Sequence, residues 1–145
     1  MAGPGPATAC TAHIRREFCV TATYYSRHPR GIRLKDCVFC RIVARETPAD
    51  VEYEDDVVLA FKDIYPKAPI HLLIVPKRHI ASITTMDAED TDVIGRCFLA
   101  ARALGEAKGL AERGYRLRVN CGPEGGQVVY HVHVHFLAGG RERGA

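Results

Sequence analysis

Apolar positions recur with the spacing of β-strands in five segments of the chain. The segments cover residues 51–55, 57–63, 70–76, 115–121 and 130–138, and each is an apolar run or an alternation of apolar and polar residues. Both patterns are typical of strands. Asp55 and Asp56 predict the turn of a hairpin, and Pro76 ends the third strand. We expect the strands to run antiparallel.

Two further segments have the spacing of helices. The second helix is predicted to begin at Asp87, a favourable N-cap, and to end at Gly109. Its apolar stripe is expected to face the core and consists of Val93, Ile94, Cys97, Phe98, Ala101 and Leu104. The first helix is short, stops at Thr47-Pro48, and is predicted from the spacing of Phe39, Ile42 and Val43.

Residues 1–36 open with Gly, Pro and Ala and show neither the period of a strand nor that of a helix, which predicts a loosely ordered extension. Six basic residues there face only Glu17 and Asp36, a net charge of +4. Such an Arg-rich, acid-poor segment is compatible with an organelle transit peptide, or with a translation start assigned too far upstream. We assign it no catalytic role.

Residues 37–145 are predicted to form one globular domain, in keeping with a hydrophobic composition of 47% for the chain. They carry 14 basic and 15 acidic side chains, so they present no basic stripe for a nucleic-acid backbone. No apolar stretch reaches the roughly 20 residues of a membrane span, and no signal peptide is recognisable. We expect a soluble protein that binds neither nucleic acid nor membranes.

The six cysteines are too few for a disulfide scaffold in 145 residues. Cys37 and Cys40 form a Cys-x₂-Cys pair, which is typical of a metal site or of a redox pair in a reducing compartment. This favours a cytoplasmic location. The cysteines predicted to lie outside any site are Cys10, Cys19, Cys97 and Cys121.

The last predicted strand contains the sequence YHVHVHF, residues 130–136. Alternate residues of a strand share a face, so His131, His133 and His135 are expected on one face with apolar residues on the other. Neutral imidazole can act as nucleophile, proton carrier or metal ligand. The alternative is a row of solvated histidines or a fortuitous metal-binding tract.

The glycine-rich segment NCGPEGGQ, residues 120–127, leads directly into the histidines. By itself it is an ordinary turn. Glycines also let successive backbone N–H groups approach an anion, and Asn120 and Gln127 add side-chain donors. A phosphate group beside the histidines is therefore the expected ligand.

Residues 37–141 resemble the histidine triad (HIT) family, and within it the Hint-like branch of nucleoside phosphoramidases and nucleotidyl hydrolases. The resemblance rests on HVHVHFL and on the sequences CVFCRIVARETPADVEYEDD, LAFKDIYPKAPIHLLIVPKRHI and NCGPEGGQVVYHVHVHFLAGGR. It implies an α+β fold in which a five-stranded antiparallel sheet is combined with two helices. It also implies a two-fold homodimer formed through the long helix and an edge strand.

The resemblance also implies roles for individual residues. His133 would attack the α-phosphorus and carry a nucleotidyl-imidazole intermediate, and His135 would hold a non-bridging oxygen. Asp63 would accept hydrogen bonds from the ribose hydroxyls. The phosphate loop would be formed by Asn120, Gly126 and Gln127. The apolar walls around the base, which could equally be plain core, would be Phe39, Ile42, Phe61 and Leu73.

The zinc-binding members of the family have two Cys and two His at the positions of Cys37, Cys40, His79 and His131. His131 would thus belong to both the triad and the metal site. Two thiolates and two imidazoles suit tetrahedral zinc and leave no position open for substrate, so the metal would be structural, one per chain. A thioredoxin-like redox pair is the alternative, but no strand precedes CVFC. No organic cofactor is expected.

Two features depart from the family pattern. Val128 occupies the place of a common Ser whose hydroxyl assists the leaving group, and the chain ends at GGRERGA without the longer aromatic tail. His71 remains open between a satisfied strand histidine and a supporting role beside the triad.

The function expected from the resemblance is hydrolysis of purine nucleoside 5′-monophosphate derivatives, with AMP-lysine and AMP-NH₂ as model phosphoramidates. The alternatives are a dinucleoside polyphosphate hydrolase or a nucleotide phosphorylase of the wider family, and a nucleotide-binding regulator with reduced catalysis.

Overall fold

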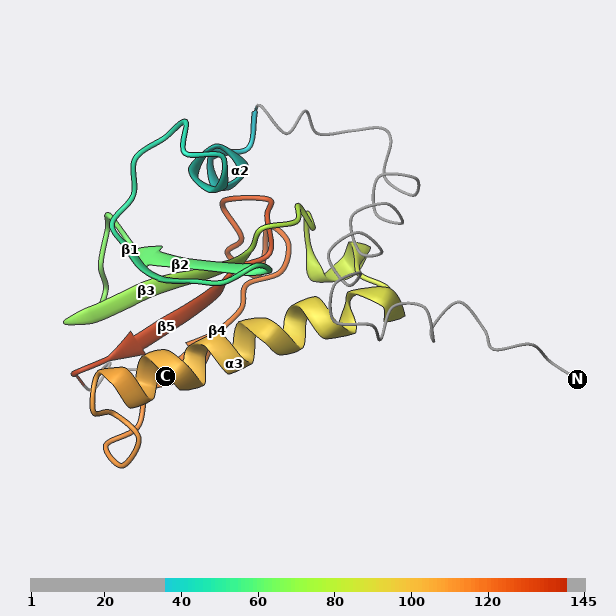
Figure 1. Ribbon diagram of the computed structural model, residues 1–145. Helices are drawn as coiled ribbons and strands as arrows, with labels where there is room; N and C mark the ends of the chain where they lie inside the picture. Colours follow the sequence, from blue (N-terminus) through green and yellow to red (C-terminus); the bar gives the residue numbers. More distant parts are fainter. Residues whose placement is uncertain (1–35, 141–145) are drawn as a thin grey trace, which may run out of the picture. The chain divides into compact units, whose positions relative to one another are not determined.

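The computed structural model describes residues 36–140 of the chain (Figure 1). The helices and strands in this range are α2 Val38–Val43, β1 Val51–Glu54, β2 Val58–Lys62, β3 Ile70–Pro76, α3 Thr91–Ala107, β4 Arg116–Arg118 and β5 Val134–Ala138. Two 3₁₀ turns, η3 Ile83–Thr85 and η4 Ala88–Asp90, lie between β3 and α3. The predicted extension over residues 1–36 lies outside the described residues, except for Asp36.

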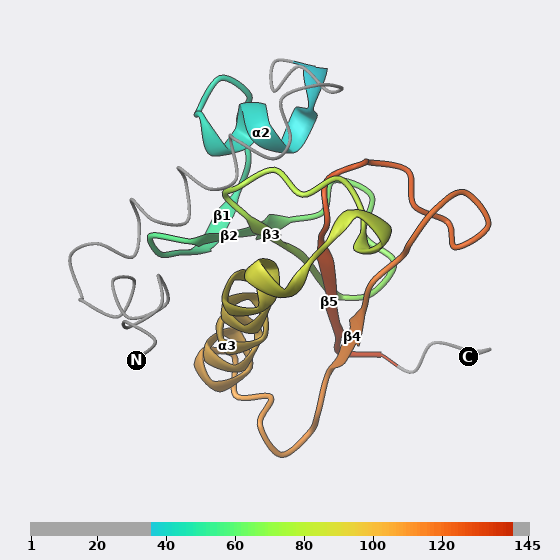
Figure 2. The ribbon, with the colours of Figure 1, turned by 90° about the vertical axis from the view of Figure 1, so that its right-hand side faces the viewer.

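The strands form one antiparallel sheet in the order β1-β2-β3-β5-β4. The long helix α3 packs along one face, and α2 lies over the other face, as the two ribbon views show (Figures 1 and 2). The predicted α+β fold with a five-stranded antiparallel sheet and two helices is therefore confirmed.

Each face of the sheet has its own apolar core. In β2, Val58 and Ala60 face α3, whereas Leu59 and Phe61 belong to the cluster beneath α2. Both sets of side chains are almost fully buried. A strand that is covered on both faces reads as a continuous apolar run, which is why β2 and β3 lack the alternation of a half-exposed strand.

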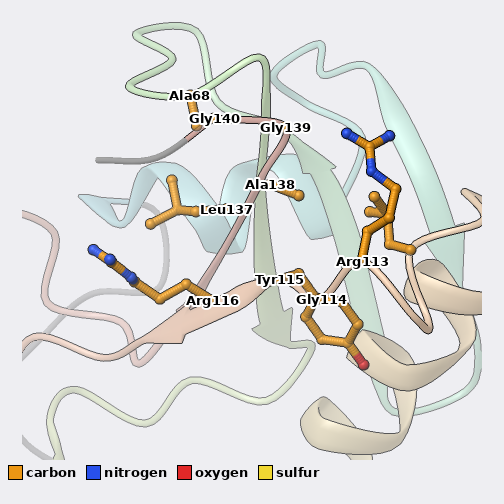
Figure 3. Close-up of a pocket in the computed structure, with 10 residues that line it drawn as sticks. Ala68, Arg113, Gly114, Tyr115, Arg116, Leu137, Ala138, Gly139 and Gly140 are labelled. Carbon is orange, nitrogen blue, oxygen red and sulfur yellow. The ribbon is translucent and has the colours of Figure 1, made fainter. Parts of the chain in front are cut away.

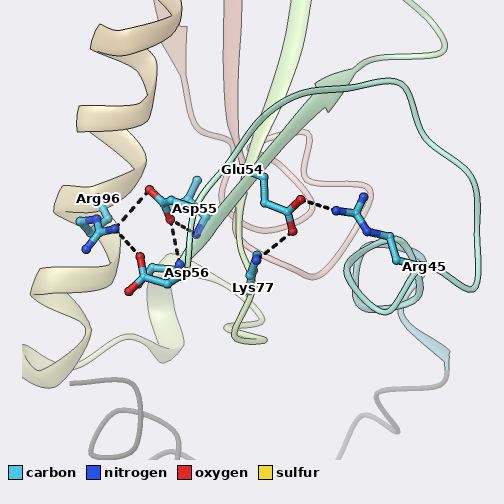
Figure 4. Close-up of polar contacts among 8 residues, drawn as sticks. Arg45, Glu54, Asp55, Asp56, Lys77 and Arg96 are labelled. Atoms are coloured by element: carbon cyan, nitrogen blue, oxygen red, sulfur yellow. Dashed lines mark hydrogen bonds and ion pairs between the residues drawn. The ribbon is translucent and has the colours of Figure 1, made fainter. Parts of the chain in front are cut away.

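The hairpin turn between β1 and β2 is fixed by its own aspartates. Asp55 Oδ1 accepts hydrogen bonds from the backbone N–H groups of Val57 (2.8 Å) and Val58 (2.7 Å). Arg96 on α3 pairs with Asp55 at 3.2 Å and with Asp56 at 2.6 Å (Figure 4). The predicted turn therefore also ties the sheet to the long helix.

The long helix begins later and buries a narrower stripe than the sequence predicted. Asp87 caps the 3₁₀ turn η4, where its side chain accepts from Glu89 N–H, and α3 begins at Thr91. Phe98 is 48% exposed, so its assignment to the core stripe was wrong. Ile94 is only half-buried. The residues of α3 that are buried are Val93, Cys97, Ala100, Ala101, Leu104 and Gly105.

Gly105 is needed where it stands, because a Cβ there would lie 2.4 Å from a ring carbon of Tyr115. The Tyr115 ring stacks on Phe136 of β5, with centroids 4.5 Å apart. The close approach of α3 to Tyr115, just before β4, thus depends on a small residue in the helix. None of the helices within residues 36–140 is long and apolar enough to cross a membrane.

The histidine strand is shorter than predicted. Only His135 lies within β5, whereas His131 and His133 precede it. The backbone leaves the sheet there because Val132 N–H donates to the Ile80 carbonyl at 2.7 Å, which draws this segment toward the loop after β3. β4 is likewise limited to Arg116–Arg118, since the chain turns after it into the glycine-rich segment.

The histidines are nevertheless inside the protein. His131 is fully buried, His133 is 7% exposed, and His135 is partly buried. The alternative of solvated histidines on an exposed face is therefore wrong. Histidines held inside the protein must each be satisfied by a partner or be available to a ligand.

Candidate active site and metal cluster

Four side chains from three segments converge at the end of β3. Cys37 is the N-cap of α2 and Cys40 lies in its first turn, while His79 and His131 come from the segments after β3 and before β5. Their potential ligand atoms all lie within 4.8 Å of one another. Cys40 Sγ is 3.3 Å from His79 Nδ1 and 3.5 Å from His131 Nδ1, and Cys37 Sγ is 3.5 Å from His131 Nδ1.

The orientation of His131 suits a ligand. Its Nε2–H donates to the Pro76 carbonyl at 2.8 Å, so its Nδ1 presents a lone pair to the two sulfur atoms. A second hydrogen bond of this kind fixes the tautomer of metal-binding histidines. A hydrogen bond from the Cys40 thiol lowers the pKa of Cys37, which favours the thiolate. The donors present therefore fit a tetrahedral metal ion with sulfur and nitrogen ligands.

His133 follows the cluster by two residues and is held through the backbone of His131. Its Nδ1–H donates to the His131 carbonyl at 2.7 Å, which leaves a lone pair on Nε2. Burial lowers its pKa, so the ring is neutral at pH 7. The edge of Phe39 approaches this ring, with centroids 5.1 Å apart. The site therefore contains a neutral, oriented imidazole that can act as a nucleophile.

His135 is oriented by a chain of hydrogen bonds that starts from the backbone. Lys67 N–H donates to His71 Nδ1 at 3.0 Å, so His71 carries its hydrogen on Nε2 and can donate it to His135 Nδ1, 2.9 Å away. His135 must then carry its own hydrogen on Nε2. That atom is buried and has no partner within residues 36–140. Burial is the main reason that the pKa of His135 falls to about 4.

The geometry favours a supporting role for His71 beside the triad, because His71 sets the tautomer of His135. Asp63, His71 and His135 also lie close enough together to be considered as metal ligands. However, His71 Nε2 bears the hydrogen that it donates to His135, so it has no lone pair for a metal ion, and Asp63 Oδ2 lies 3.3 Å from the same atom.

The four residues predicted as walls of a base pocket are brought together beneath α2. They are buried in one cluster and comprise Phe39, Ile42, Phe61 and Leu73. The Phe39 ring meets Phe61 edge-on at 5.6 Å, and the same ring meets His133. The apolar cluster therefore adjoins the histidines directly. Asp63, one residue after β2, is at the same end of the site, beside His71.

The glycine-rich segment is held in shape by the side chains predicted to bind phosphate. Gln127 is buried; its Oε1 accepts from Gly122 N–H at 3.0 Å and its Nε2 donates to the Ala81 carbonyl at 2.8 Å. Asn120 Nδ2 donates to the Gly126 carbonyl at 3.3 Å. Gly126 has φ 77°, a conformation that favours glycine. Gln127 thus shapes the loop, whereas Asn120 is more accessible.

Comparisons with known proteins agree with this architecture. The family model described as "Scavenger mRNA decapping enzyme C-term binding" matches residues 36–143. An uncharacterized HIT-like protein of Synechococcus elongatus is 47% identical over 105 residues, which cover 72% of this chain and 91% of the relative. The purine nucleoside phosphoramidase of Escherichia coli K12 is 44% identical over 105 residues, covering 72% and 88% of the two chains. The chain belongs to the histidine triad family.

Solved structures of the histidine triad family have the same fold. A HIT family hydrolase from Legionella pneumophila is 47% identical with a TM-score of 0.72, over 73% of this chain and 95% of that chain. A histidine triad protein from Clostridium difficile is 38% identical with a TM-score of 0.75, over 79% and 99% of the two chains.

This histidine triad protein also has a hollow away from the histidines. A cavity of about 690 Å³ lies where β5 ends, between the loop after α3 and the turn after β5 (Figure 3). Tyr115, Arg116 and Leu137 are among its lining residues, and none of the predicted site residues lines it. The chemistry expected of a triad therefore does not belong to this cavity.

Arg118 is a residue near the triad that sequence reasoning missed. It is the last residue of β4 and pairs with His135 on β5. Nothing in the sequence distinguishes it from the other basic residues of the chain. Its place depends on the register of β4 against β5, which is a tertiary property.

Proposed function

We propose that this histidine triad protein hydrolyses purine nucleoside 5′-phosphoramidates, of which AMP-NH₂ is the simplest. Its relationship to a hydrolase family, and to a relative named purine nucleoside phosphoramidase, supports nucleotide hydrolysis as the general activity. The specific proposal rests on the hydrogen positions of two imidazole rings, which make one Nε2 atom an acceptor and the other a donor. His133 Nε2 has a lone pair, and His135 Nε2 has a hydrogen without a partner among residues 36–140.

The proposed reaction has two steps. His133 Nε2 attacks the α-phosphorus, the P–N bond to the leaving amine breaks, and the amine departs with a proton taken from solvent, which the water of the second step gives back. Water then attacks the nucleotidyl-imidazole, which releases the nucleoside monophosphate and restores neutral His133. Dividing the reaction at one anchored intermediate lowers each barrier. His135 Nε2–H would donate to a non-bridging oxygen, where negative charge develops.

The remaining residues would bind the nucleotide. Asp63 would accept from the ribose hydroxyls, and Asn120 and the Gly126 backbone would hold phosphate oxygens in a loop shaped by Gln127. The base would lie against the apolar cluster of Phe39, Ile42, Phe61 and Leu73. In this arrangement the base site and the phosphate site would meet where Phe39 contacts His133.

We also propose that Cys37, Cys40, His79 and His131 hold one structural zinc ion per chain. When bound, zinc would cross-link α2 to the segment after β3 and to the segment before β5, without taking part in the reaction. His131 would position His133 through its carbonyl oxygen. Reduced thiols of this kind are consistent with a cytoplasmic protein.

Two structural proposals complete this assignment. Residues 37–145 would form the catalytic domain, and residues 1–36 would be dispensable for turnover. A homodimer would form through α3 and the edge strand β4, since Phe98 and Leu99 are large apolar side chains of α3 with 48% and 57% exposure. Exposed apolar side chains of this size are common where a partner surface packs.

Turnover of AMP-NH₂ by the purified full-length chain tests the function. We expect release of AMP and ammonia, and much slower hydrolysis of diadenosine tetraphosphate. A protein that hydrolyses the dinucleotide but not AMP-NH₂ would instead be a polyphosphate hydrolase. A protein that binds AMP but hydrolyses neither compound would be a nucleotide-binding regulator.

A further inference from the structure

A single hydrogen lies between two acceptors beside the triad. His71 Nδ1 accepts from Lys67 N–H at 3.0 Å, so the ring carries its hydrogen on Nε2. That nitrogen lies 2.9 Å from His135 Nδ1 and 3.3 Å from Asp63 Oδ2. The side chains of His71 and Asp63 are 1% and 16% exposed, so water competes little for this hydrogen. A stronger bond to one acceptor therefore means a weaker bond to the other.

The three groups lie on the inner strands of the sheet. Asp63 directly follows β2, His71 is on β3, and His135 is on β5. Leu73 is the cross-strand partner of His135, lies two residues from His71, and belongs to the apolar cluster beneath α2. Because alternate residues of a strand share a face, both histidines point to the α2 face of the sheet. The proposed dimer through α3 and β4 would use the opposite face and the edge.

The two acceptors of the His71 hydrogen differ in strength. Asp63 Oδ2 belongs to a carboxylate, and hydrogen bonds to ionised acceptors are about twice as strong as those to neutral ones such as His135 Nδ1. Asp63 Oδ1 already accepts from Tyr65 N–H at 2.9 Å, which turns Oδ2 toward His71. In the absence of substrate the carboxylate therefore draws the hydrogen away from His135, although it is the more distant acceptor.

The charge of Asp63 also reaches the two histidines of the triad that would meet the phosphate. Burial lowers the pKa of His133 and of His135, and the Asp63 carboxylate partly opposes this effect at both rings. A change in how Asp63 is hydrogen-bonded is therefore felt where the reaction is proposed to occur.

We infer that His71 is a positioning residue that couples recognition of the ribose at Asp63 to activation of the phosphate at His135. The inference rests on the proposed function, in which Asp63 accepts from the ribose hydroxyls and His135 Nε2–H donates to a non-bridging oxygen. Hydroxyls that donate to Asp63 satisfy the carboxylate, and the His71 hydrogen then passes fully to His135 Nδ1. This fixes the His135 hydrogen on Nε2 and polarises the ring, which makes Nε2–H the better donor.

The coupling defines a substrate class. Nucleotides with free 2′ and 3′ hydroxyls should be turned over faster than deoxynucleotides, and not only bound more tightly. A contact that is equally strong in the bound substrate and in the transition state changes KM alone, whereas one that improves the transition state raises kcat. Direct contacts between Asp63 and the ribose account only for KM, so an effect on kcat is the signature of the His71 path.

Two substrates that differ only in the ribose test this with the full-length protein. They are AMP-NH₂ and its 2′,3′-dideoxy analogue. Loss of a whole preorganised donor typically costs about 10²–10³ in rate, and the dideoxy substrate only weakens the donor at His135. We therefore expect kcat to be about tenfold lower for the dideoxy substrate, in addition to a higher KM.

His71→Gln is the variant that removes the competition. A carboxamide oxygen can accept from Lys67 N–H, and its nitrogen has two hydrogens, one for Asp63 and one for His135. The kcat values of this variant for the two substrates should differ by less than about twofold, while the difference in KM remains. Arg113→Gln is the control, because Arg113 is exposed in the loop before β4. It should keep the parental ratio of the two kcat values.

A measurement without turnover follows the tautomer itself. In protein labelled with ¹⁵N at histidine, the chemical shifts of the two ring nitrogens show which of them carries the hydrogen. With AMP bound we expect the full difference between Nδ1 and Nε2 of His135. With 2′,3′-dideoxy-AMP bound the difference should be smaller, because the His71 hydrogen is again shared with Asp63.

The two kinds of measurement separate the coupling from the reaction. Equal kcat values of the parental protein for both substrates, or a His71→Gln protein that keeps the parental ratio, would overturn the role of His71. A parental protein that does not hydrolyse AMP-NH₂ would contradict the proposed function, and the ring shifts would then decide alone. Identical His135 shifts with the two nucleotides would overturn the coupling, whereas different shifts would support it.

Discussion

Replacing His71 tests the hydrogen-bond chain that orients the triad. His71 is 4% exposed, accepts from Lys67 N–H at 3.0 Å, and lies 2.9 Å from His135 Nδ1. His71→Leu fills a similar volume but leaves both of those polar groups without a partner. At about 1–3 kcal/mol for each of the two unsatisfied groups, the free energy of unfolding should fall by about 2–6 kcal/mol.

The catalytic effect has a separate cause. Without a donor on its Nδ1 side, His135 is free to carry its hydrogen there, and Nε2 then loses the hydrogen that the developing phosphoryl charge requires. Loss of one such preorganised donor typically costs about 10²–10³ in rate, so kcat for AMP-NH₂ should fall by roughly a hundredfold. AMP affinity should change little, because Asp63 and the glycine-rich loop remain.

His71→Gln is the matched variant, since a carboxamide offers one acceptor and one donor. It can accept from Lys67 N–H and donate to His135, so we expect it to retain activity within about tenfold of the parent. Urea unfolding and steady-state kinetics on the three proteins supply the measurements. A folded His71→Leu protein with parental kcat would show that the tautomer of His135 is not set by His71.

Three further predictions concern the nucleophile, the pH dependence and the metal. His133→Ala should bind AMP but lose at least about 10³ in kcat. When the parent protein is mixed with radioactive substrate and quenched in base, the label should map to His133. A label on His135 would reverse the roles of the two histidines. Because the pKa values of His133 and His135 are lowered, the latter to about 4, the acid limb of kcat/KM should lie below pH 6.5. The pKa of His135 in the folded protein is below its unfolded value of about 6.5, so the unfolded chain takes up the proton first as the pH falls. The free energy of unfolding should therefore decline between about pH 6.5 and about pH 4. A flat stability profile over that window would contradict the burial of His135. Elemental analysis should find one zinc per chain, and chelation or Cys40→Ser should lower the melting temperature; protein that stays metal-free after zinc addition would exclude the site.

Local sequence patterns were enough to predict the fold class, the hairpin at Asp55 and Asp56, and the presence of a histidine triad. These features depend on local periodicity and on side chains close together in the chain. The extent of the histidine strand did not follow in the same way. His131 and His133 have the alternation of a strand, but they precede β5, and Val132 N–H between them donates to the Ile80 carbonyl of the loop after β3.

Tertiary structure alone decided which polar groups meet. His71 and His135 are 64 residues apart, yet the pairing of β3 with β5 joins their rings and thereby sets a tautomer. Phe98 has the spacing of a core residue but is 48% exposed, and it lies outside the apolar cluster that α3 forms with the sheet. Arg118 has no distinguishing local pattern, and only the register of β4 against β5 places its charge beside His135. Local periodicity predicts elements, whereas contacts between distant segments depend on how those elements align.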